Sequence, residues 1–276
     1  MTAPKANRFL RTREALFEEY LSSKVPETRS PLHPLYRYAL FSGGKRVRPL
    51  LVISLGELLS ASQERVLPWA AAVEMVHTAS LVHDDLPLLD NDDLRRGKPT
   101  LHKAFSPGLA LLAGDGLVSL GAEVLQEASY STSLKLRLTQ LLLRSWGDQG
   151  IAGGQSMELL PDSDPLDLFA MKTGALFAAA LEGTALILGF TPKRVKLFAS
   201  LGEELGIVFQ LQDDLQDSGS SSFNILFRLN RPECLRLLEE KVDRCRRMVH
   251  TLKVDAPPFN ELMERILTRG KDEKAP

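Results

Sequence analysis

The feature that most constrains this chain is a long apolar segment that ends in two adjacent carboxylates. Between Pro68 and His83 the sequence is rich in Ala, Val, Leu and Met and contains few charges. A helix that is apolar on most of its sides is buried in the core of a protein. Asp84 and Asp85 follow at the end of this helix, where the helix dipole is negative and disfavours anions. A fold that accepts this segment needs a cation beside the two carboxylates.

Magnesium is the cation that this arrangement favours, because it prefers hard carboxylate oxygens. In a regular helix Asp84 and Asp90 would lie on different faces, but Pro87 breaks the hydrogen-bond ladder between them. We therefore expect Asp90 to turn back toward Asp84. An acidic loop at the end of a surface helix is the alternative interpretation. The apolar character of the preceding helix argues against it.

A second acidic set ends another apolar segment later in the chain. Asp213 and Asp217 are one turn apart on a helix face, and Gln210 precedes Asp213 by one turn. Near the first set, Arg95 and Arg96 carry guanidinium groups, which grip phosphate oxygens in pairs. Simple ion pairing with the neighbouring aspartates is the other interpretation of these arginines. Carboxylates suited to magnesium beside arginines suited to phosphate predict a site for a metal-bound diphosphate.

Helical periodicity dominates the chain, and strand signals are nearly absent. Hydrophobic residues make up 44% of the 276 residues, and no Pro-, Ser- or Gly-rich linker is long enough to divide them. We predict an all-α fold in which residues 1–276 form one domain, a large helical bundle around a central cavity. The predicted helices cover 8–21, 35–41, 50–59, 68–83, 109–128, 134–149, 165–188, 192–217, 232–252 and 259–268. Residues 153–154 and 161–165 are expected to be connectors.

Bulk charge and cysteine content exclude several classes of partner. The formal net charge is -1, so no overall field draws the chain to nucleic acid or to an anionic membrane. Cys234 and Cys245 form neither a disulfide framework nor a zinc pattern. The N-terminus lacks the apolar core of a secretory signal, and no apolar stretch is expected to reach the roughly 20 residues that span a bilayer. We therefore expect a cytoplasmic protein with no transmembrane segment.

These segments together resemble the trans-type isoprenyl diphosphate synthases. The stretch DDLPLLDNDDLRRGKPTLH at 84–102 resembles the first aspartate-rich motif of the short-chain members, the farnesyl and geranylgeranyl diphosphate synthases. Further matching segments are GGKRVRP at 43–49, AGDGL at 113–117, GGQ at 153–155, MKTG at 171–174 and FQLQDD at 209–214. The resemblance extends from about residue 16 to residue 217. It implies the isoprenoid synthase fold, with antiparallel helices around a deep cavity, in a homodimer.

The resemblance also implies a reaction and a role for each matched residue. The chain would condense isopentenyl diphosphate with dimethylallyl, geranyl or farnesyl diphosphate to give a short-chain trans-prenyl diphosphate. About three magnesium ions would be held against the allylic diphosphate by Asp84, Asp85, Asp90 and Asp213, with Asp214 and Asp217 in support. Arg95 and Lys172 would contact that diphosphate, and Thr173 and Gln210 would lie beside the reacting carbons. Isopentenyl diphosphate would be bound by Lys45, Arg48, His77 and Arg96. Without the matched motifs, these last residues would be read as surface charges and a core histidine.

One segment departs from the family pattern. After Asp217 the family continues with a flap that contains lysines, whereas this chain reads SGSSSFNIL at 218–226. The shortened flap favours an alternative, a non-catalytic or regulatory subunit of a prenyl synthase, while the intact aspartates favour an enzyme. A terpene cyclase or head-to-head synthase would not need Lys45, Arg48 and His77. A plain helical interaction protein would leave two buried acidic clusters unexplained.

Product length should depend on the floor of the pocket along the helix before Asp84. The residue five positions earlier is Ala79, with Met75 and Val76 one turn further back. A bulky aromatic side chain there would stop chain growth early, and alanine does not. We therefore expect geranylgeranyl rather than farnesyl diphosphate. By resemblance, the spacing between Asp84 and Asp90 argues against very long products.

Overall fold

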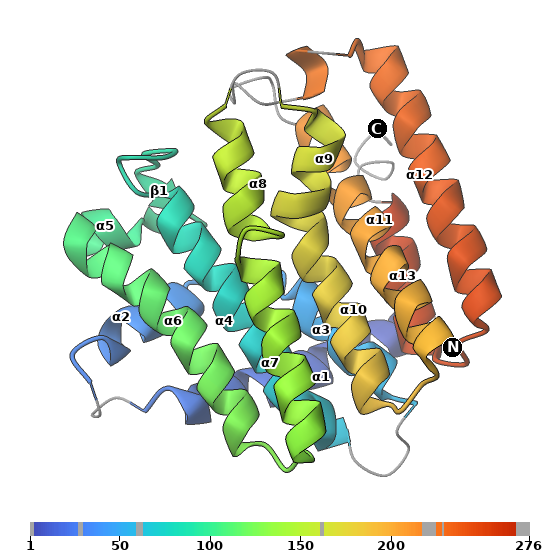
Figure 1. The fold of residues 1–276 in the computed structure, drawn as a ribbon, viewed down its shortest axis with the longest axis horizontal. Coiled ribbons are helices and arrows are strands. Elements are labelled where there is room, and N and C mark those ends of the chain that lie inside the picture. The colour runs from blue at the N-terminus through green and yellow to red at the C-terminus, as the bar shows by residue number, and fades with distance from the viewer. Residues whose placement is uncertain are drawn as a thin grey trace.

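Long helices that run side by side make up most of this protein (Figure 1). The computed structural model describes residues 3–26, 30–58, 63–160, 163–216, 225–227 and 229–268. The elements up to the hairpin are α1 (Ala3–Lys24), α2 (His33–Leu40), α3 (Val47–Gly56), η1 (Gln63–Val66), α4 (Leu67–Asp84), β1 (Leu94–Arg95) and β2 (Lys98–Pro99). Those that follow are α5 (Leu101–Ala104), α6 (Pro107–Glu127), α7 (Thr132–Trp146), α8 (Ile151–Glu158), α9 (Pro165–Phe169), η2 (Ala170–Gly174), α10 (Ala175–Ile187), α11 (Pro192–Gln216), η3 (Ile225–Phe227), α12 (Arg231–Leu252) and α13 (Pro257–Thr268). The predicted all-α fold is confirmed.

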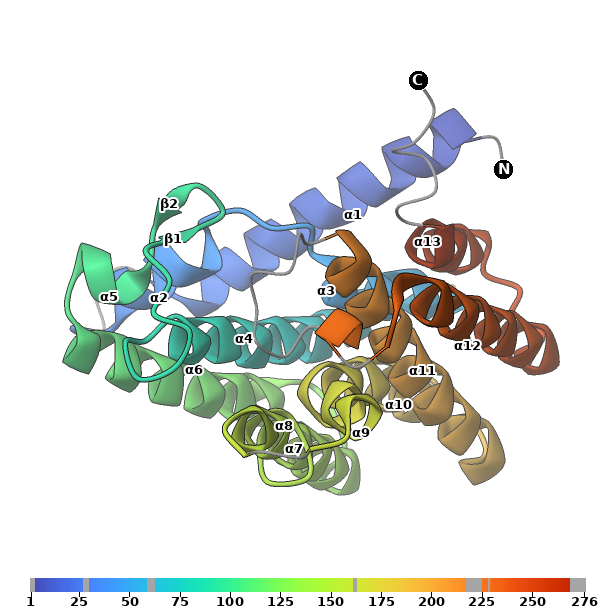
Figure 2. The same cartoon turned by 90° about the horizontal axis from the view of Figure 1, so that it is seen from above.

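Helix α4 lies in the interior of the bundle. Figure 2 shows it between α1 on one side and α6 with α7 on the other, and it also packs against α3 and α10. Nearly every residue from Leu67 to Val76 is fully buried, as the uniform apolar pattern predicts. Trp69 is fully buried, and its indole Nε1 donates a hydrogen bond to the carbonyl of Ala180 in α10, 3.1 Å away. The bundle therefore fixes the position of α4, whose last residue is Asp84.

Helix α8 contains a glycine pair whose composition predicts a connector. Residues 153–154 lie inside α8, so that prediction is wrong. A Cβ atom on Gly154 would come within 2.4 Å of the backbone nitrogen of Lys172, so only glycine lets α8 approach η2 this closely. Here the missing side chain serves packing between helices rather than a turn. The approach brings α8 against the Lys172 segment.

A two-stranded hairpin, also missed, follows the first acidic set. Leu94 pairs with Pro99 and Arg95 with Lys98 in antiparallel register. The two turn residues, Arg96 and Gly97, have φ of 55° and 77°. Positive φ at both central residues is typical of the type I′ turn of tight hairpins. The hairpin determines where Arg95 and Arg96 project from the end of α4.

Among the residues that the structure describes, two helices are long and apolar enough to cross a membrane, contrary to the expectation from sequence. They are Pro107–Glu127 and the continuous segment Pro165–Ile187, with mean hydropathy of 1.5 and 1.2. Buried residues make up 44% and 56% of the most apolar 18-residue window in each. A core helix of a bundle needs the same apolar surface, so length and composition alone are weak evidence for a membrane span.

Candidate active site

A cavity of about 560 Å³ opens where several helix ends meet. It is bordered by the end of α4, the start of α3, the hairpin, η2 and the last turns of α11. The structure brings most of the predicted site residues to its wall: Lys45, Arg48, His77, Asp84, Arg95, Arg96, Lys172, Thr173, Gln210 and Asp213. Asp85, Asp90 and Asp214 do not line it, and Asp217 lies outside the described residues, as do 218–224 of the expected flap.

Asp84 and Asp213 bring the two acidic sets into one cavity. Asp84 is 9% exposed, and burial raises its pKa to about 7, against the opposing effect of the Lys172 ammonium. The Asp90 amide donates to the carbonyl of Asp84 at 2.8 Å, so the loop does turn back as expected. The charge of Asp90 adds to the raised pKa of Asp84. A positive charge beside Asp84 would stabilise its ionised form and offset the repulsion between Asp84 and Asp90.

Asp85 does not line the cavity and is instead paired with Arg95. Arg95 Nε donates to Asp85 Oδ1 at 2.9 Å, and its Nη2 contacts both Asp85 and Asp92, the latter at 2.7 Å. Burial raises the pKa of Asp85 while Arg95 opposes that shift. For Arg95, simple ion pairing with neighbouring aspartates is therefore what the structure contains. Its guanidinium still reaches the cavity wall.

Asp214 anchors the other acidic segment internally. It is 6% exposed, and its two carboxylate oxygens accept hydrogen bonds from Gln210 Nε2 and from the backbone N–H of Ile225, both at 2.9 Å. Asp214 thus joins the end of α11 to η3, which begins within the last residues of the expected flap segment 218–226. Its carboxylate orients the amide of Gln210 toward Thr173.

Thr173 and Gln210 meet across the cavity wall. Thr173 Oγ1 donates to Gln210 Oε1 at 3.0 Å. Thr173 lies in η2, one turn of π-helix, a feature frequent at functional sites because it displaces side chains from the regular helical register. A Cβ atom on Gly206 would lie 2.5 Å from the Cα of Gly174, so glycine allows α11 to pack closely against η2.

Lys172 forms an ion pair that the sequence analysis did not anticipate. Its Nζ lies 2.7 Å from Glu158 Oε2 at the end of α8. Burial lowers the pKa of Lys172, but the charges of Asp84 and Glu158 outweigh burial and raise it overall. Glu158 follows the matched GGQ segment by only three residues, which is the one sequence signal that could have pointed to it.

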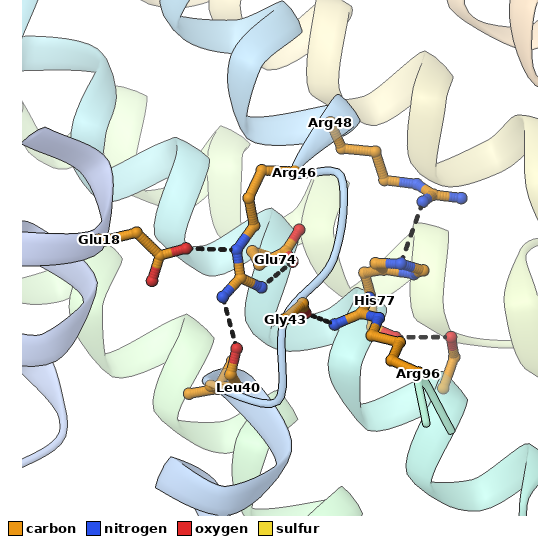
Figure 3. Close-up of polar contacts among 9 residues, drawn as sticks. Glu18, Leu40, Gly43, Arg46, Arg48, Glu74, His77 and Arg96 are labelled. Carbon is orange, nitrogen blue, oxygen red and sulfur yellow. Dashed lines mark hydrogen bonds and ion pairs between the residues drawn. The ribbon is translucent and has the colours of Figure 1, made fainter. Parts of the chain in front are cut away.

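Another part of the cavity lining, the cationic wall of Lys45, Arg48, His77 and Arg96, is only partly compensated; Figure 3 shows the last three of these residues. Arg48 Nη1 lies 3.3 Å from His77 Nε2, and a guanidinium can only donate, so His77 accepts there as a neutral ring protonated at Nδ1. Burial and the charges of Arg48 and Arg96 hold the pKa of His77 well below its usual range. Burial lowers the pKa of Arg48 to about 10, and its Nε has no hydrogen-bond partner among the described residues. The guanidinium stacks 4.4 Å above the ring of Phe177. This wall is suited to an anion.

Arg96 and Lys45 complete the cationic wall. The Arg96 guanidinium donates to the carbonyl of Gly43 and lies across Gly44, where a Cβ atom would meet it at 2.5 Å. Gly44 has φ of 133°, which favours glycine for a second reason. Lys45 is exposed at the rim of the cavity. The glycine turn and the hairpin thus place their cations beside each other.

The part of the cavity lining that carries Asp84 and Asp213, called the acidic wall below, has the donor chemistry that magnesium requires. Within the described part of the chain, no three Asp, Glu, His or Cys side chains converge on one point. Magnesium is usually bound by one or two carboxylates together with substrate phosphates rather than by a cage of protein groups. Asp84 and Asp213, two carboxylates that line the same cavity, fit that pattern.

Comparison with known proteins identifies relatives over most of the chain. The family model described as Polyprenyl synthetase matches residues 29–225. A farnesyl diphosphate synthase of Micrococcus luteus is 37% identical over 216 residues, 76% of this chain and 74% of the relative. Geranylgeranyl pyrophosphate synthase 4 of Arabidopsis thaliana is 39% identical over 200 residues, 69% of this chain and 54% of the relative. The solved structure of an FPP/GFPP synthase from Zymomonas mobilis superposes with a TM-score of 0.88 at 32% identity, covering 96% of this chain and all of that one.

We predict that Asp84→Asn stabilises the metal-free protein at pH 8. Below pH 3.8 the carboxyl group of Asp84 is protonated in both states; between pH 3.8 and about 7 only the unfolded chain releases the proton. Stability therefore falls as pH rises through that window, and the full cost is present above it. At about 1.4 kcal/mol per pKa unit, the free energy of unfolding should rise by up to about 4 kcal/mol on substitution.

Urea unfolding in EDTA at pH 8 and at pH 4 measures this effect. The gain should be largest at pH 8 and small at pH 4. Asp93→Asn is the matched control, because Asp93 is exposed in the same loop and paired with Lys103. A loss of stability in Asp84→Asn at pH 8 would contradict the assigned burial cost.

Proposed function

We infer the function from one premise: this chain belongs to the polyprenyl synthetase family. We propose that it is a prenyltransferase that condenses isopentenyl diphosphate with an allylic diphosphate. The observation that carries the proposal is a single cavity with two anion sites of different chemistry. One wall offers carboxylates for a metal-bound diphosphate, and the other offers cations that bind a diphosphate directly.

The allylic diphosphate is assigned to the acidic wall. Asp84 and Asp213 would hold magnesium, about three ions by analogy with the family, with Asp85 and Asp90 reaching the outer ions. When bound, magnesium neutralises the leaving diphosphate and favours ionisation of the allylic C–O bond. Asp217, one turn beyond Asp213, would join the same set.

Two cationic side chains near the acidic wall form ion pairs with carboxylates in the structure. Arg95 is paired with Asp85, and Lys172 is paired with Glu158. Both also line the cavity, so each can transfer its hydrogen bonds to a diphosphate oxygen that enters. The Asp85 carboxylate that Arg95 releases becomes available as a metal ligand. Binding of the diphosphate and completion of the metal site would thus occur together.

The residues beside the reacting carbons protect a cation from water. Thr173 and Gln210 present fixed oxygen dipoles to the cavity, since each is held by a hydrogen bond. Leu81, Ile151 and Phe209 supply apolar wall that excludes water from the allylic cation. The double bond of isopentenyl diphosphate then attacks that cation, and the released diphosphate accepts the final proton.

Isopentenyl diphosphate is assigned to the cationic wall. Arg48 has an unpartnered Nε beside the bond to His77, and Arg96 and Lys45 lie next to it. The neutral His77 ring can donate its Nδ1 proton to a phosphate oxygen. No metal is needed here, because these cations balance the diphosphate charge by themselves.

We also propose that the protein works as a homodimer in the cytoplasm. Exposed leucines lie on two neighbouring helices, at Leu109, Leu111 and Leu112 of α6 and at Leu136 and Leu143 of α7. The homodimer is proposed by resemblance to the family, and these apolar side chains are available for such a contact. The two cysteines are buried free thiols, which suits a reducing compartment.

A turnover assay tests the proposed reaction. Purified protein with magnesium, isopentenyl diphosphate and each of the three allylic diphosphates should give an elongated product that disappears in EDTA. Asp84→Ala should lower kcat about 100-fold or more, because the metal loses a ligand, while Asp93→Ala should stay near wild type. Absence of product with every allylic substrate, from folded protein, would favour the non-catalytic subunit instead.

Product length gives a separate prediction at Ala79. We propose geranylgeranyl diphosphate as the product, because Ala79 is a small, fully buried residue on α4. Ala79→Leu and Ala79→Tyr should shorten the product progressively. Added bulk in a core costs about 1–3 kcal/mol, so Ala70→Leu, on the opposite side of α4, controls for overpacking without altering the product. An unchanged product distribution in folded Ala79→Tyr would refute the assigned pocket floor.

A further inference from the structure

The cationic wall contains a carboxylate that ought to interfere with anion binding. Glu74 lines the cavity, is 1% exposed and lies one helical turn before His77 on α4. Burial lowers the pKa of both Arg48 and Arg96, and the negative charge of Glu74 is the largest effect that opposes this shift in each. The charge of Glu74 therefore reaches both arginines. Left alone, it would pair with the same cations that a diphosphate needs.

Arg46, which also lines the cavity, binds this carboxylate (Figure 3). Its Nη1 donates to Glu74 Oε1 at 2.6 Å, its Nε to Glu18 Oε1 at 2.6 Å, and its Nη2 to the carbonyl of Leu40 at 2.5 Å. Arg46 is 4% exposed, so its guanidinium is fully used inside the protein. In Figure 3 it points toward Glu18 and Leu40, away from Arg48.

The backbone of Arg46 has an uncommon conformation that the contacts of its side chain stabilise. Arg46 immediately precedes α3 and adopts the left-handed conformation, with φ of 46° and ψ of 34°. That conformation is uncommon for a residue with a side chain and persists where surrounding contacts fix it. The three hydrogen bonds of its guanidinium are such contacts. They direct Arg46 inward, while Lys45 stays at the exposed rim of the cavity.

We propose that Arg46 is a positioning residue that sequesters Glu74 and so reserves Arg48, His77 and Arg96 for the diphosphate of the second substrate. The choice of isopentenyl diphosphate as that substrate rests on the proposed function. With Glu74 neutralised by Arg46, the cationic wall keeps its positive charge. Without Arg46, Glu74 turns to Arg48 or Arg96 and competes with the substrate.

The proposal predicts a specific pattern in a double-mutant cycle. Arg46→Met should raise KM for isopentenyl diphosphate about tenfold or more, because a freed carboxylate repels the substrate, while KM for the allylic substrate stays within about twofold. The double variant Arg46→Met, Glu74→Gln should recover most of the affinity, because it removes the competing charge. Glu18→Gln is the matched control: it alters the other carboxylate partner of Arg46 and should leave both KM values unchanged.

Other roles of Arg46 give different patterns. If Arg46 only maintained the fold, the double variant would be no better than Arg46→Met. If Arg46 bound substrate directly, removal of Glu74 would not restore affinity. Either result would overturn the proposal. Should Arg46→Met fail to fold, the nearly isosteric Glu74→Gln alone decides: KM for isopentenyl diphosphate should fall or stay equal, and an increase of about threefold or more would contradict sequestration.

Equilibrium binding separates this inference from the proposed reaction. Calorimetry with isopentenyl diphosphate, without metal and without allylic substrate, reports on the cationic wall alone. If the wild type binds but does not turn over, and binding follows the same loss and recovery across the variants, the inference stands and the proposed reaction fails. If the wild type turns over and the double variant does not recover, the reaction stands and the inference fails.

Discussion

The structure depends on charges that the fold removes from water and does not fully compensate. Asp84 is a buried carboxylate whose pKa is raised to about 7, and Arg48 is a guanidinium whose pKa burial lowers to about 10. Both line one cavity, where each raises the free energy of the unliganded protein. Such charges are tolerated where a bound ligand of opposite charge compensates them. A metal-bound diphosphate suits the first and a bare diphosphate suits the second, and the proposed placement of the two substrates in different parts of the cavity rests on this difference.

Helix α4 sets the spacing between these two walls. Glu74, His77, Leu81 and Asp84 all line the cavity, and their spacing places them along one helix face. His77 and Asp84 are seven residues apart, roughly 10 Å along the axis at 1.5 Å per residue. One rigid, buried helix therefore holds the carboxylate of Asp84 and the part of the cationic wall at His77 at a fixed separation. The surrounding helices support it, and the close approaches at Gly154 and Gly206 bring α8 and α11 near enough to complete the cavity.

The sequence was sufficient for features that depend on local pattern and insufficient for those that depend on distant pairing. The all-α fold, the end of α4 at Asp84 and the return of Asp90 toward it follow from apolar periodicity and from Pro87. The pairs Arg46–Glu74 and Lys172–Glu158 join residues 28 and 14 positions apart in different segments, and neither helical nor strand periodicity pairs residues at such separations. Residues 153–154 were misread because glycine signals a turn as readily as a close helix contact. The roles given to the site residues, and the contribution of Asp217 with its short flap, remain predictions.

The central claim is that magnesium, bound together with a diphosphate, compensates the buried carboxylates of the acidic wall. Thermal unfolding of the metal-free protein, titrated with inorganic diphosphate in the presence and absence of magnesium, tests it most directly. Diphosphate alone can bind at the cationic wall, so the account predicts an additional stabilisation that appears only with magnesium, about 2.7 kcal/mol when the magnesium-bound ligand is at 100 times its Kd, and the loss of this increment in Asp84→Ala. If magnesium adds no stabilisation beyond that of diphosphate alone, or if the magnesium-dependent increment survives in Asp84→Ala, the account is contradicted.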